Sequence, residues 1–363
     1  MNTNRYGKSL EGLRVVKIKI ADKLIGEREP CFIIAEAGIN HNGDISLARK
    51  LIDAAREAGA DAVKFQIFQT EGLVTASAEK APYQKETTGT HESQFKMLKS
   101  CELSQRDFGE LFDYARKKGI IFLATPFDRD SVDFLEGLRV PAFKVGSGEI
   151  TNFPLLKHIA RKMKPVILST GMATLEEVKE ALDVIKEEGE KEIVLLHCVS
   201  SYPAKIEDMN LKAMESLRRA FKLPVGLSDH SPGTTISVAA TALGACVIEK
   251  HFTLDKDLPG PDHRASLEPE ELKQMVTAVR HVEKAMGNGI KKPVRDEEEN
   301  KKVGRRSIVA RVDIPRGTII SKDMLDIKRP GTGLAPKYLE EITGKAAKVS
   351  IKKDEIITMG KLK

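Results

Sequence analysis

The feature of this sequence that most constrains its fold is a regular alternation of short apolar runs with amphipathic segments of helical period, from residue 32 to about residue 286. The apolar runs are rich in β-branched residues. Such an alternation predicts parallel strands that are each followed by a helix. About eight runs qualify as strands, the number that closes a (β/α)8 TIM barrel. They span Phe32–Asn40, Ala62–Ile67, Ile120–Phe127, Ala142–Ser147, Val166–Thr170, Ile193–Val199, Val225–His230 and Cys246–Thr253.

The segments between these runs carry the start and stop signals of helices. Ser104 opens one segment and Gly119 closes it, while Thr174 and Gly189 frame another. Hydroxyl side chains cap helix starts and glycines end helices. An open doubly wound sheet is the alternative, but no G-x-G-x-x-G or G-x-x-x-x-G-K-[ST] pattern supports a nucleotide-binding version of it. We therefore expect the barrel.

The sequence changes character after residue 286. Residues 287–306 replace apolar periodicity with Gly-Asn-Gly, Lys-Lys-Pro and an acidic run, which indicates a linker. Beyond it, the segment from Ala310 to Ser321 resembles the segment from Ala347 to Thr358. This degenerate repeat predicts a small, mostly β module with pseudo-twofold character over residues 307–363. We expect residues 1–286 to form the barrel domain, preceded by an N-terminal extension.

Composition excludes several classes of function. The chain has 59 Lys and Arg against 53 Asp and Glu, with both signs interspersed, so no basic stripe indicates a nucleic-acid partner. No apolar stretch approaches the length of a membrane span or a signal peptide core. The four cysteines, scattered without C-x-x-C spacing, are typical of reduced core thiols. We expect a cytoplasmic protein that acts on a small anionic molecule.

Polar residues mark the end of every candidate strand. In a (β/α)8 barrel the loops after the strands build the open mouth, so catalytic groups lie at the carboxyl ends of the strands. The candidates in chain order are Glu36 with the turn Asn40–Gly43, Lys64 and Gln66, Thr125, Lys144 with Ser147 and Glu149, Ser169, Ser200 with Tyr202, Ser228 with His230, and Glu249 with His251. The sequence therefore predicts an active site at this end of the barrel.

Two histidines are candidate metal ligands. His230 and His251 lie at the ends of neighbouring candidate strands, and each is flanked by carboxylates. Such a pair suits a divalent transition ion that keeps open positions for substrate. Each histidine alone would more often be a hydrogen-bonded core residue, but their paired placement favours the metal site.

Two lysines are candidate anion ligands. Lys64 and Lys144 lie within strands that we expect to be buried, where an ammonium group is costly unless an anion compensates it. A phosphate or carboxylate would do so, and internal ion pairs with Glu36 and Glu149 are the alternative. Small hydroxyls and glycines on the neighbouring loops suit a phosphate. Asp262, in a Pro-Gly-Pro-Asp loop after the last strand, would face a polyhydroxylated ligand.

Seven segments resemble motifs of the N-acetylneuraminate (sialic acid) synthase family, and they occur in order over nearly the whole chain. They are Ile34–Gly43, Val63–Gln66, Phe143–Glu149, Leu168–Met172, Gly226–His230, Ile248–Phe252 and Pro259–Asp262. The tail from Ser307, with Lys328-Arg-Pro-Gly331, is similar to the C-terminal antifreeze-like (SAF) domain of that family. The resemblance implies condensation of phosphoenolpyruvate with N-acetylmannosamine, or a related 2-acetamido sugar, to a nonulosonic acid with release of phosphate.

The resemblance also implies roles for the candidate residues. It implies Mn2+, or another divalent cation such as Mg2+ or Co2+, on His230 and His251. The residues implied to bind phosphoenolpyruvate are Lys64, Thr125, Lys144, Ser147, Ser169 and Ser228, and those implied to line the metal and sugar sites are Glu36, Gln66, Tyr202, Glu249 and Asp262. Glu149 would orient the attacking water, so that Glu149, Lys64, Lys144 and Glu36 are the expected catalytic groups.

The match departs from the family at one point and leaves three alternatives. Where some members have Thr-Asn, this chain has Val199-Ser200, so Ser200 stands in place of an asparagine. The family is a domain-swapped homodimer in which an arginine at the position of Arg329 reaches the partner's sugar. The alternatives are a synthase for a 6-phosphorylated amino sugar, one for a legionaminic or pseudaminic product, and a non-catalytic carbohydrate- or ice-binding protein. The loop Pro259–Asp262 favours the sialic and legionaminic branches.

Overall fold

The computed structural model describes residues 16–363 and divides into two compact units between Gly287 and Asn288. This division lies one residue from the boundary expected at residue 286. Each unit has a hydrophobic core of its own. The first unit carries the cavity described below, and the two units are described separately.

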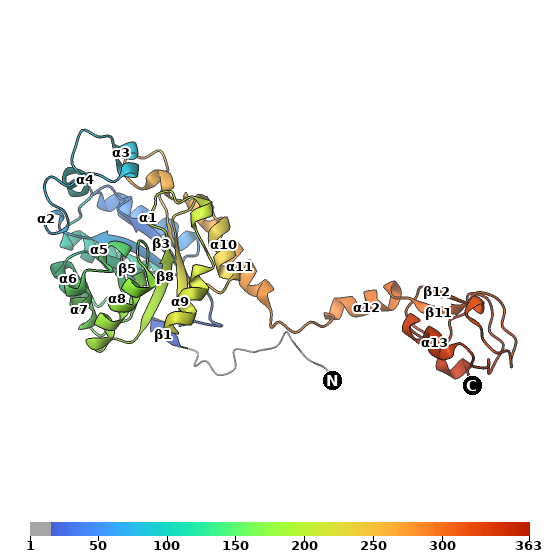
Figure 1. Ribbon diagram of the computed structural model, residues 1–363. Coiled ribbons are helices and arrows are strands. Elements are labelled where there is room, and N and C mark those ends of the chain that lie inside the picture. Colours follow the sequence, from blue (N-terminus) through green and yellow to red (C-terminus); the bar gives the residue numbers. More distant parts are fainter. Residues whose placement is uncertain (1–15) are drawn as a thin grey trace. The chain divides into compact units, whose positions relative to one another are not determined.

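The first unit is built on eight parallel strands in the order β5-β4-β3-β10-β9-β8-β7-β6. Figure 1 labels β3, β5 and β8 of this sheet. Strands β5 and β6, at the two ends of this order, contact each other, so the sheet curls into a barrel. The strands are β3 (Phe32–Gly38), β4 (Ala62–Ile67), β5 (Ile121–Pro126), β6 (Phe143–Val145), β7 (Val166–Ser169), β8 (Ile193–Cys198), β9 (Val225–Asp229) and β10 (Val247–His251). The expected (β/α)8 barrel is confirmed.

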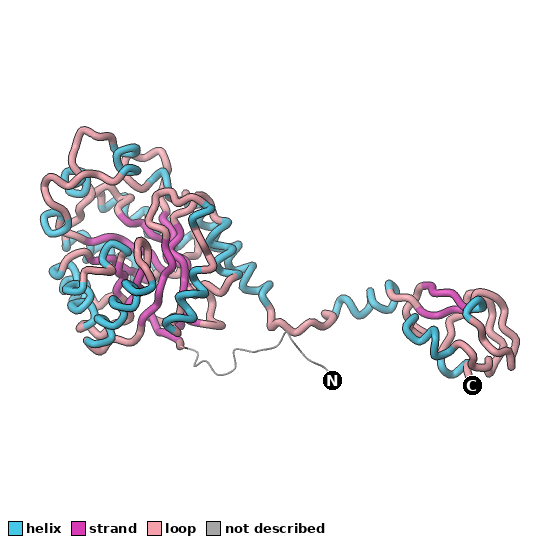
Figure 2. Tube along the Cα trace, viewed as in Figure 1, coloured by secondary structure: helices cyan, strands magenta, loops and turns pink. Residues whose placement is uncertain are grey.

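Helices cover the outer face of this sheet (Figure 2). The main helices are α1 (Ile45–Glu57), α5 (Gln105–Lys118), α6 (Arg129–Gly137), α7 (Phe153–Ala160), α8 (Leu175–Glu187), α9 (Ala213–Phe221), α10 (Thr235–Ala242) and α11 (Pro269–Met286). The predicted caps are in place, since Ser104 and Thr174 each form a capping box, and Gly119 ends α5 in the left-handed conformation. Three short helices follow β4: α2 (Thr70–Leu73), α3 (Pro82–Thr88) and α4 (Gln94–Ser100).

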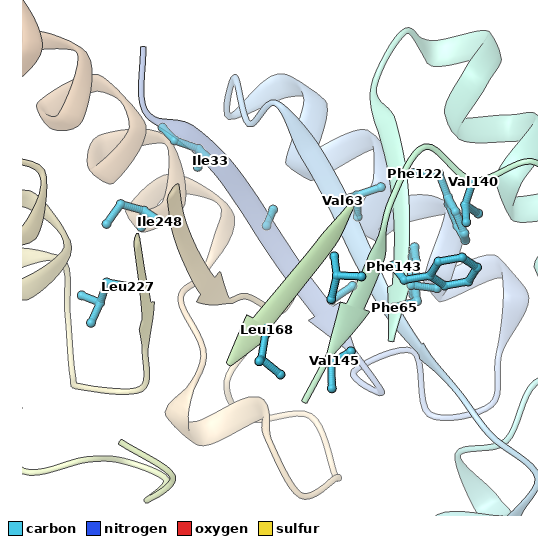
Figure 3. Close-up of a cluster of buried hydrophobic side chains, with 14 of the residues drawn as sticks. Ile33, Val63, Phe65, Phe122, Val140, Phe143, Val145, Leu168, Leu227 and Ile248 are labelled. Carbon is cyan, nitrogen blue, oxygen red and sulfur yellow. The ribbon is translucent and has the colours of Figure 1, made fainter. Parts of the chain in front are cut away.

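The largest core lies between the sheet and the helices, as the labelled residues of Figure 3 illustrate. Because side chains alternate along a strand, one set faces the helices and the other faces the inside of the barrel. In β4, for example, Val63 and Phe65 belong to the outer core, whereas Lys64 and Gln66 line the central cavity. The same alternation holds for β3, where Ile33 packs outward and Glu36 lines the cavity.

A hairpin that the sequence analysis did not assign packs on the inner apolar side chains of the barrel. Strands β1 (Lys17–Ile20) and β2 (Lys23–Gly26) pair antiparallel. Ile18, Ile20 and Ile25 are buried against residues at the amino ends of the barrel strands, such as Phe32. The hairpin therefore covers the end of the barrel opposite the polar strand ends.

The second unit, which begins at Asn288, contains a helix where a linker was expected. Helix α12 (Arg295–Gly304) has three acidic residues in its first turn and lysines in its last turn. These charges complement the helix dipole, and Lys301–Glu298 and Lys302–Glu299 pair one turn apart. Its side chains are not buried, so apolar periodicity was absent from its sequence. The remaining elements are β11 (Ser307–Ala310), β12 (Leu325–Lys328) and α13 (Leu339–Ile342).

The backbone pairs of the second unit follow the predicted internal repeat. Residues 37 apart occupy equivalent positions, and Ile314 pairs with its own equivalent, Ile351. The bridge between Val309 and Ile356 has its counterpart in the bridge between Ile319 and Ala346. An antiparallel pairing of this kind is what a twofold relation produces. The predicted pseudo-twofold relation is confirmed, whereas β11 and β12 are the only regular strands within residues 307–363 and the other pairings are isolated bridges.

Two further expectations bear on the whole described chain. The four cysteines are buried and unpaired. No helix within residues 16–363 combines the length and apolar character needed to span a bilayer.

Candidate active site

The carboxyl ends of the strands enclose a cavity of about 250 Å³. All eight barrel strands contribute to it, through Glu36, Lys64, Gln66, Thr125, Lys144, Ser169, Cys198, Ser228, Glu249 and His251, and the loops add Phe127, Gly146, Ser147, Gly148, Met172, Ser200, Tyr202 and His230. Of the sixteen predicted site residues, only Glu149, Asp262 and Arg329 are not among those that line it. The structure thus brings the predicted polar strand ends together.

Four buried charged groups interact in the inner part of the cavity. Lys64 forms an ion pair with Glu36, and its Nζ lies 3.7 Å from Oε2 of Glu249. Lys144 Nζ lies 3.4 Å from Oε1 of Glu249. The ion-pair alternative named Glu149 as the partner of Lys144, and that pairing is wrong, because the carboxylate that pairs with Lys144 comes from β10. The ion-pair alternative for both lysines is therefore present in the structure.

The electrostatics of these groups are unequal. Burial opposes ionisation of Glu249, but Lys144 and Lys64 outweigh it and lower its pKa to about 2. Burial raises the pKa of Glu36, and Glu249 adds to the effect. Burial lowers the pKa of Lys144. Glu36 is thus the carboxyl group that most readily holds a proton, and Lys144 is the cation least satisfied by its surroundings.

Small hydroxyl groups surround the two lysines. Lys64 donates a hydrogen bond to Oγ1 of Thr125, at 2.9 Å. Ser147 Oγ accepts a hydrogen bond from the Gly171 amide at 3.0 Å, and Ser228 donates to Glu249 at 2.8 Å. The buried Oγ of Ser169 has no hydrogen-bond partner. A buried hydroxyl left without a partner indicates that a ligand or water completes the site.

The two candidate metal ligands lie side by side. The ring centroids of His230 and His251 are 5.4 Å apart. His230 contacts the Val199 carbonyl through Nδ1 at 2.8 Å. In the neutral ring, donation from Nδ1–H to this carbonyl leaves the lone pair on Nε2. Burial opposes protonation of His230, but Cys198 and the Val199 carbonyl outweigh it and raise the pKa of this imidazole. Burial lowers the pKa of His251 well below its usual value, and the nearby charges of His230 and Lys64 act in the same direction, so this imidazole is neutral.

These residues fit a divalent cation with open positions. Neutral imidazoles bind transition ions, and the buried Nδ1 of His251 and Oε2 of Glu249 have no hydrogen-bond partner. Within residues 16–363, no group of three or more His, Cys, Asp or Glu side chains is arranged as a metal site. The protein thus offers two imidazoles, and a substrate or water would supply further ligands.

Asp262 lies beside this cavity in a loop that side chains of the β3 end hold in place. Asn40 donates to the carbonyl of Phe252 and to Ser266, and Ser266 donates to the carbonyl of Asp262. Asn42 donates to the carbonyl of Pro259 at 2.7 Å. The Asn40–Gly43 turn thus positions the loop. Burial raises the pKa of Asp262 to about 6, and its Oδ1 has no hydrogen-bond partner.

Two predicted site residues lie elsewhere. Glu149, in a single 3-10 turn, accepts a hydrogen bond from Asn152 at 2.6 Å and does not line the cavity. Arg329 belongs to the second unit, is exposed, and has no carboxylate within 4.0 Å among the residues described. Their roles stay predictions.

Sequence reasoning missed two residues at the mouth and inner wall. Cys198 was interpreted as a core thiol but lines the cavity, as strand alternation after Leu196 would have indicated. Burial raises its pKa, but His230, Ser147 and Lys144 together outweigh this and lower it to about 7. Tyr83 of α3 stacks on Tyr202, with ring centroids 5.0 Å apart. No local signal in the sequence indicated this contact, because it depends on how the segment after β4 folds back.

Comparisons with known proteins agree with this arrangement. Residues 51–291, more than half of the chain, match the NeuB family, and residues 305–363 match the SAF domain. The chain is 54% identical over 327 residues to the N,N'-diacetyllegionaminic acid synthase of Campylobacter jejuni. This alignment covers 90% of this chain and 98% of the relative. It is 41% identical over 337 residues to human N-acetylneuraminate-9-phosphate synthase, covering 92% of this chain and 93% of the relative.

A solved structure gives the same result. The N-acetylneuraminic acid synthetase of Leptospira borgpetersenii, in complex with citrate, aligns with a TM-score of 0.70 and 37% identity, over 79% of this chain and 95% of that one. These relatives are synthases, and the expectation of an enzyme of this type is confirmed over that of a non-catalytic binding protein. The chain therefore belongs to the NeuB family and carries a SAF domain at its carboxyl end.

Proposed function

We propose that this enzyme condenses phosphoenolpyruvate with an N-acetylated amino sugar, such as N-acetylmannosamine, and water to a nonulosonic acid and phosphate. The observation that supports this most is the cavity, in which two buried lysines lie beside two adjacent imidazoles. Identity to the diacetyllegionaminic acid synthase is higher than to the neuraminate-9-phosphate synthase, 54% against 41%. A di-N-acetylated acceptor is therefore the first to test, and a 6-phosphorylated amino sugar is the alternative.

The lysine end of the cavity suits phosphoenolpyruvate. Lys64 and Lys144 supply positive charge to its phosphate and carboxylate, and Thr125, Ser147 and Ser169 supply hydroxyl groups. Binding of this anion would relieve the burial cost of Lys144, whose pKa is lowered by burial.

The imidazole end suits the carbonyl of the open-chain sugar. His230 and His251 would hold Mn2+, or Mg2+ or Co2+ in its place. When bound, such a cation supplies the Lewis acidity that makes the sugar aldehyde electrophilic. The neutral state of His251 keeps a lone pair available for it. Tyr202 packs against His230, with ring centroids 4.1 Å apart.

The reaction balances without an external oxidant or reductant. Carbon three of the enol attacks the aldehyde carbon, a carbon–carbon bond forms, and the aldehyde oxygen takes up a proton. Positive charge develops at carbon two and is trapped by water, which gives up one proton and so balances the proton taken up by the aldehyde oxygen. The bond from carbon two to the phosphate oxygen then breaks, which releases inorganic phosphate and leaves a ketone.

A carboxylate must stabilise the positive charge at carbon two. Glu149 is implied for the water by family resemblance, but Glu36 and Glu249 are the carboxylates that line the cavity. We assign the charge stabilisation to Glu249, which stays ionised, and the proton transfer to Glu36, whose pKa is raised. Comparison of Glu36→Gln with Glu149→Gln tests this assignment, since we expect the greater loss of turnover for Glu36→Gln.

We also propose a domain-swapped homodimer in the cytoplasm. What supports it is that the second unit is compact by itself and that Arg329 is exposed without a carboxylate partner among the described residues. If Arg329 completes the partner's site, then mixing Arg329→Ala with His251→Ala subunits restores part of the activity that each variant lacks. Absence of any recovery in confirmed mixed dimers would contradict the swap.

The overall reaction is tested directly. The protein is incubated with phosphoenolpyruvate, Mn2+ and a panel of sugars: N-acetylmannosamine, its 6-phosphate and a di-N-acetylated six-carbon sugar. Phosphate release is measured, and products are identified by mass. Acceptor-dependent phosphate release with a nine-carbon acid as product supports the proposal, and no release with any sugar overturns it.

A further inference from the structure

The segment between β4 and α5 folds back over the mouth of the cavity. Leu98 of α4 packs in a small core with Phe68 and Ile39 at the ends of the barrel strands. Thr87 of α3 donates a hydrogen bond to the carbonyl of Pro261 at 3.2 Å. This contact ties α3 to the loop that carries Asp262.

Within this segment, Tyr83 continues an aromatic stack that starts at the imidazoles. Tyr202 lies 4.1 Å from His230 and meets His251 edge-on at 5.7 Å between ring centroids. The ring of Tyr83 lies 5.0 Å from that of Tyr202, on α3. Tyr83 therefore lies one ring further from the imidazoles than Tyr202.

The group that faces Tyr83 is an incompletely satisfied carboxylate. Asp262 is 6% exposed, and its buried Oδ1 has no hydrogen-bond partner. Burial raises the pKa of the Tyr83 hydroxyl, and the nearby charge of Asp262 adds to the effect. Gln84 donates a hydrogen bond to that hydroxyl at 3.3 Å. Oδ1 of Asp262, beside the Tyr83 hydroxyl, can therefore accept a hydrogen bond from a ligand.

The positions of Tyr83 and Asp262 indicate which substrate these two residues would contact. Under the proposed function, phosphoenolpyruvate occupies the end with Lys64 and Lys144, and the acceptor's carbonyl lies at the imidazoles. The rest of the acceptor must then extend away from the lysines, past Tyr202. Tyr83 and Asp262 do not line the inner cavity, so they are placed to meet the tail of the acceptor and not the donor.

We propose that Tyr83 is a specificity-determining residue of the acceptor subsite, where its hydroxyl and the Asp262 carboxylate together bind a hydroxyl or amide N–H on the sugar tail. The ring covers the tail by stacking on Tyr202. This inference rests on the proposed function and adds a residue to it.

The test is steady-state kinetics of Tyr83→Phe with the best acceptor of the panel. We expect the KM for the acceptor to rise about tenfold, as for a hydrogen bond to a charged group, while the KM for phosphoenolpyruvate stays within twofold. The matched control is Tyr114→Phe, since Tyr114 also directs its hydroxyl to a carboxylate, Asp53, at 2.8 Å, but on the outer helices. That control should leave both KM values unchanged.

An acceptor analogue without the tail hydroxyl completes the test. Wild type and Tyr83→Phe should use this analogue with equal KM, because the hydrogen bond is absent in both cases. An unchanged acceptor KM in Tyr83→Phe, in an active protein, overturns the role of Tyr83 and leaves the proposed function standing. A wild-type protein that releases no phosphate with any sugar overturns the proposed function and this assignment with it.

Discussion

The buried ion pair between Asp229 and Lys250 allows a quantitative prediction. These residues are paired in register, and their side chains face away from the cavity, with Nζ of Lys250 3.0 Å from Oδ2 of Asp229. Neither side chain has any exposed surface. Each directly precedes one of the two candidate metal ligands, so the pair joins the two strand ends that carry the imidazoles.

The substitution Lys250→Met tests how much this pair contributes. It leaves the Asp229 charge buried without its cation, which in proteins costs about 3–5 kcal/mol. Asp229 keeps three other hydrogen bonds, from the Ser231 amide at 2.9 Å and from the Ser231 and Ser237 hydroxyls at 2.6 Å each. We therefore expect a loss of about 3 kcal/mol, at the lower end of that range. The double variant Asp229→Asn/Lys250→Met removes both charges and should recover about half of the loss.

The assay is urea unfolding followed by circular dichroism, with the transition of the barrel compared between variants. Lys179→Met is the matched control, because the Lys179–Asp183 pair on α8 is largely exposed and such pairs contribute less than about 1 kcal/mol. If Lys250→Met costs no more than the control, or if the double variant is less stable than the single one, the reasoning about the buried charge is refuted.

Three further predictions concern the site. Folding raises the pKa of Asp262 to about 6, so the folded chain binds the proton more tightly and the free energy of unfolding falls as pH rises from about 4 to about 6. The variant Asp262→Asn should abolish this fall and be about 3 kcal/mol more stable than wild type at pH 8. Chemical unfolding measured across this pH range checks both expectations. Lys144→Ala should lower phosphate release by at least about 100-fold while circular dichroism shows a folded protein, and full activity would remove Lys144 from the donor site. At Gly38 φ is +53° and an added Cβ would lie 3.3 Å from Oε1 of Glu36, so Gly38→Ala should cost about 1–2 kcal/mol of stability and also reduce turnover. Gly119 has a similar φ of +71° but open space around it, so Gly119→Ala should show the stability cost alone. Equal turnover in the two variants would contradict the argument that the added Cβ crowds Glu36.

The barrel could be predicted from the sequence because each strand places apolar side chains toward the helices and other side chains toward the inside of the barrel. In β10, Ile248 faces the helices while Glu249 and His251 face the cavity, and this alternation of apolar and polar residues is visible in the sequence. The position of the site followed, since all parallel strands of a barrel end at the same rim.

Other features depend on contacts that local pattern does not record. The pairing of Lys144 with Glu249 links strands that are far apart in the sequence, so the ion-pair alternative named the nearer Glu149 instead. Helix α12 is stabilised by charges of its own and not by an apolar face, so periodicity did not indicate it. Tyr83 reaches the mouth only because α3 is tied to the loop after β10.

The β1–β2 hairpin closes the amino end of the barrel, and the cavity lies at the carboxyl ends of the strands. A ligand bound at the inner end of the cavity must therefore bind first and dissociate last. Under the proposed function, a sugar bound against Tyr202 would block access to Lys64 and Lys144. We therefore expect phosphoenolpyruvate to bind before the sugar, and a large excess of sugar to slow turnover.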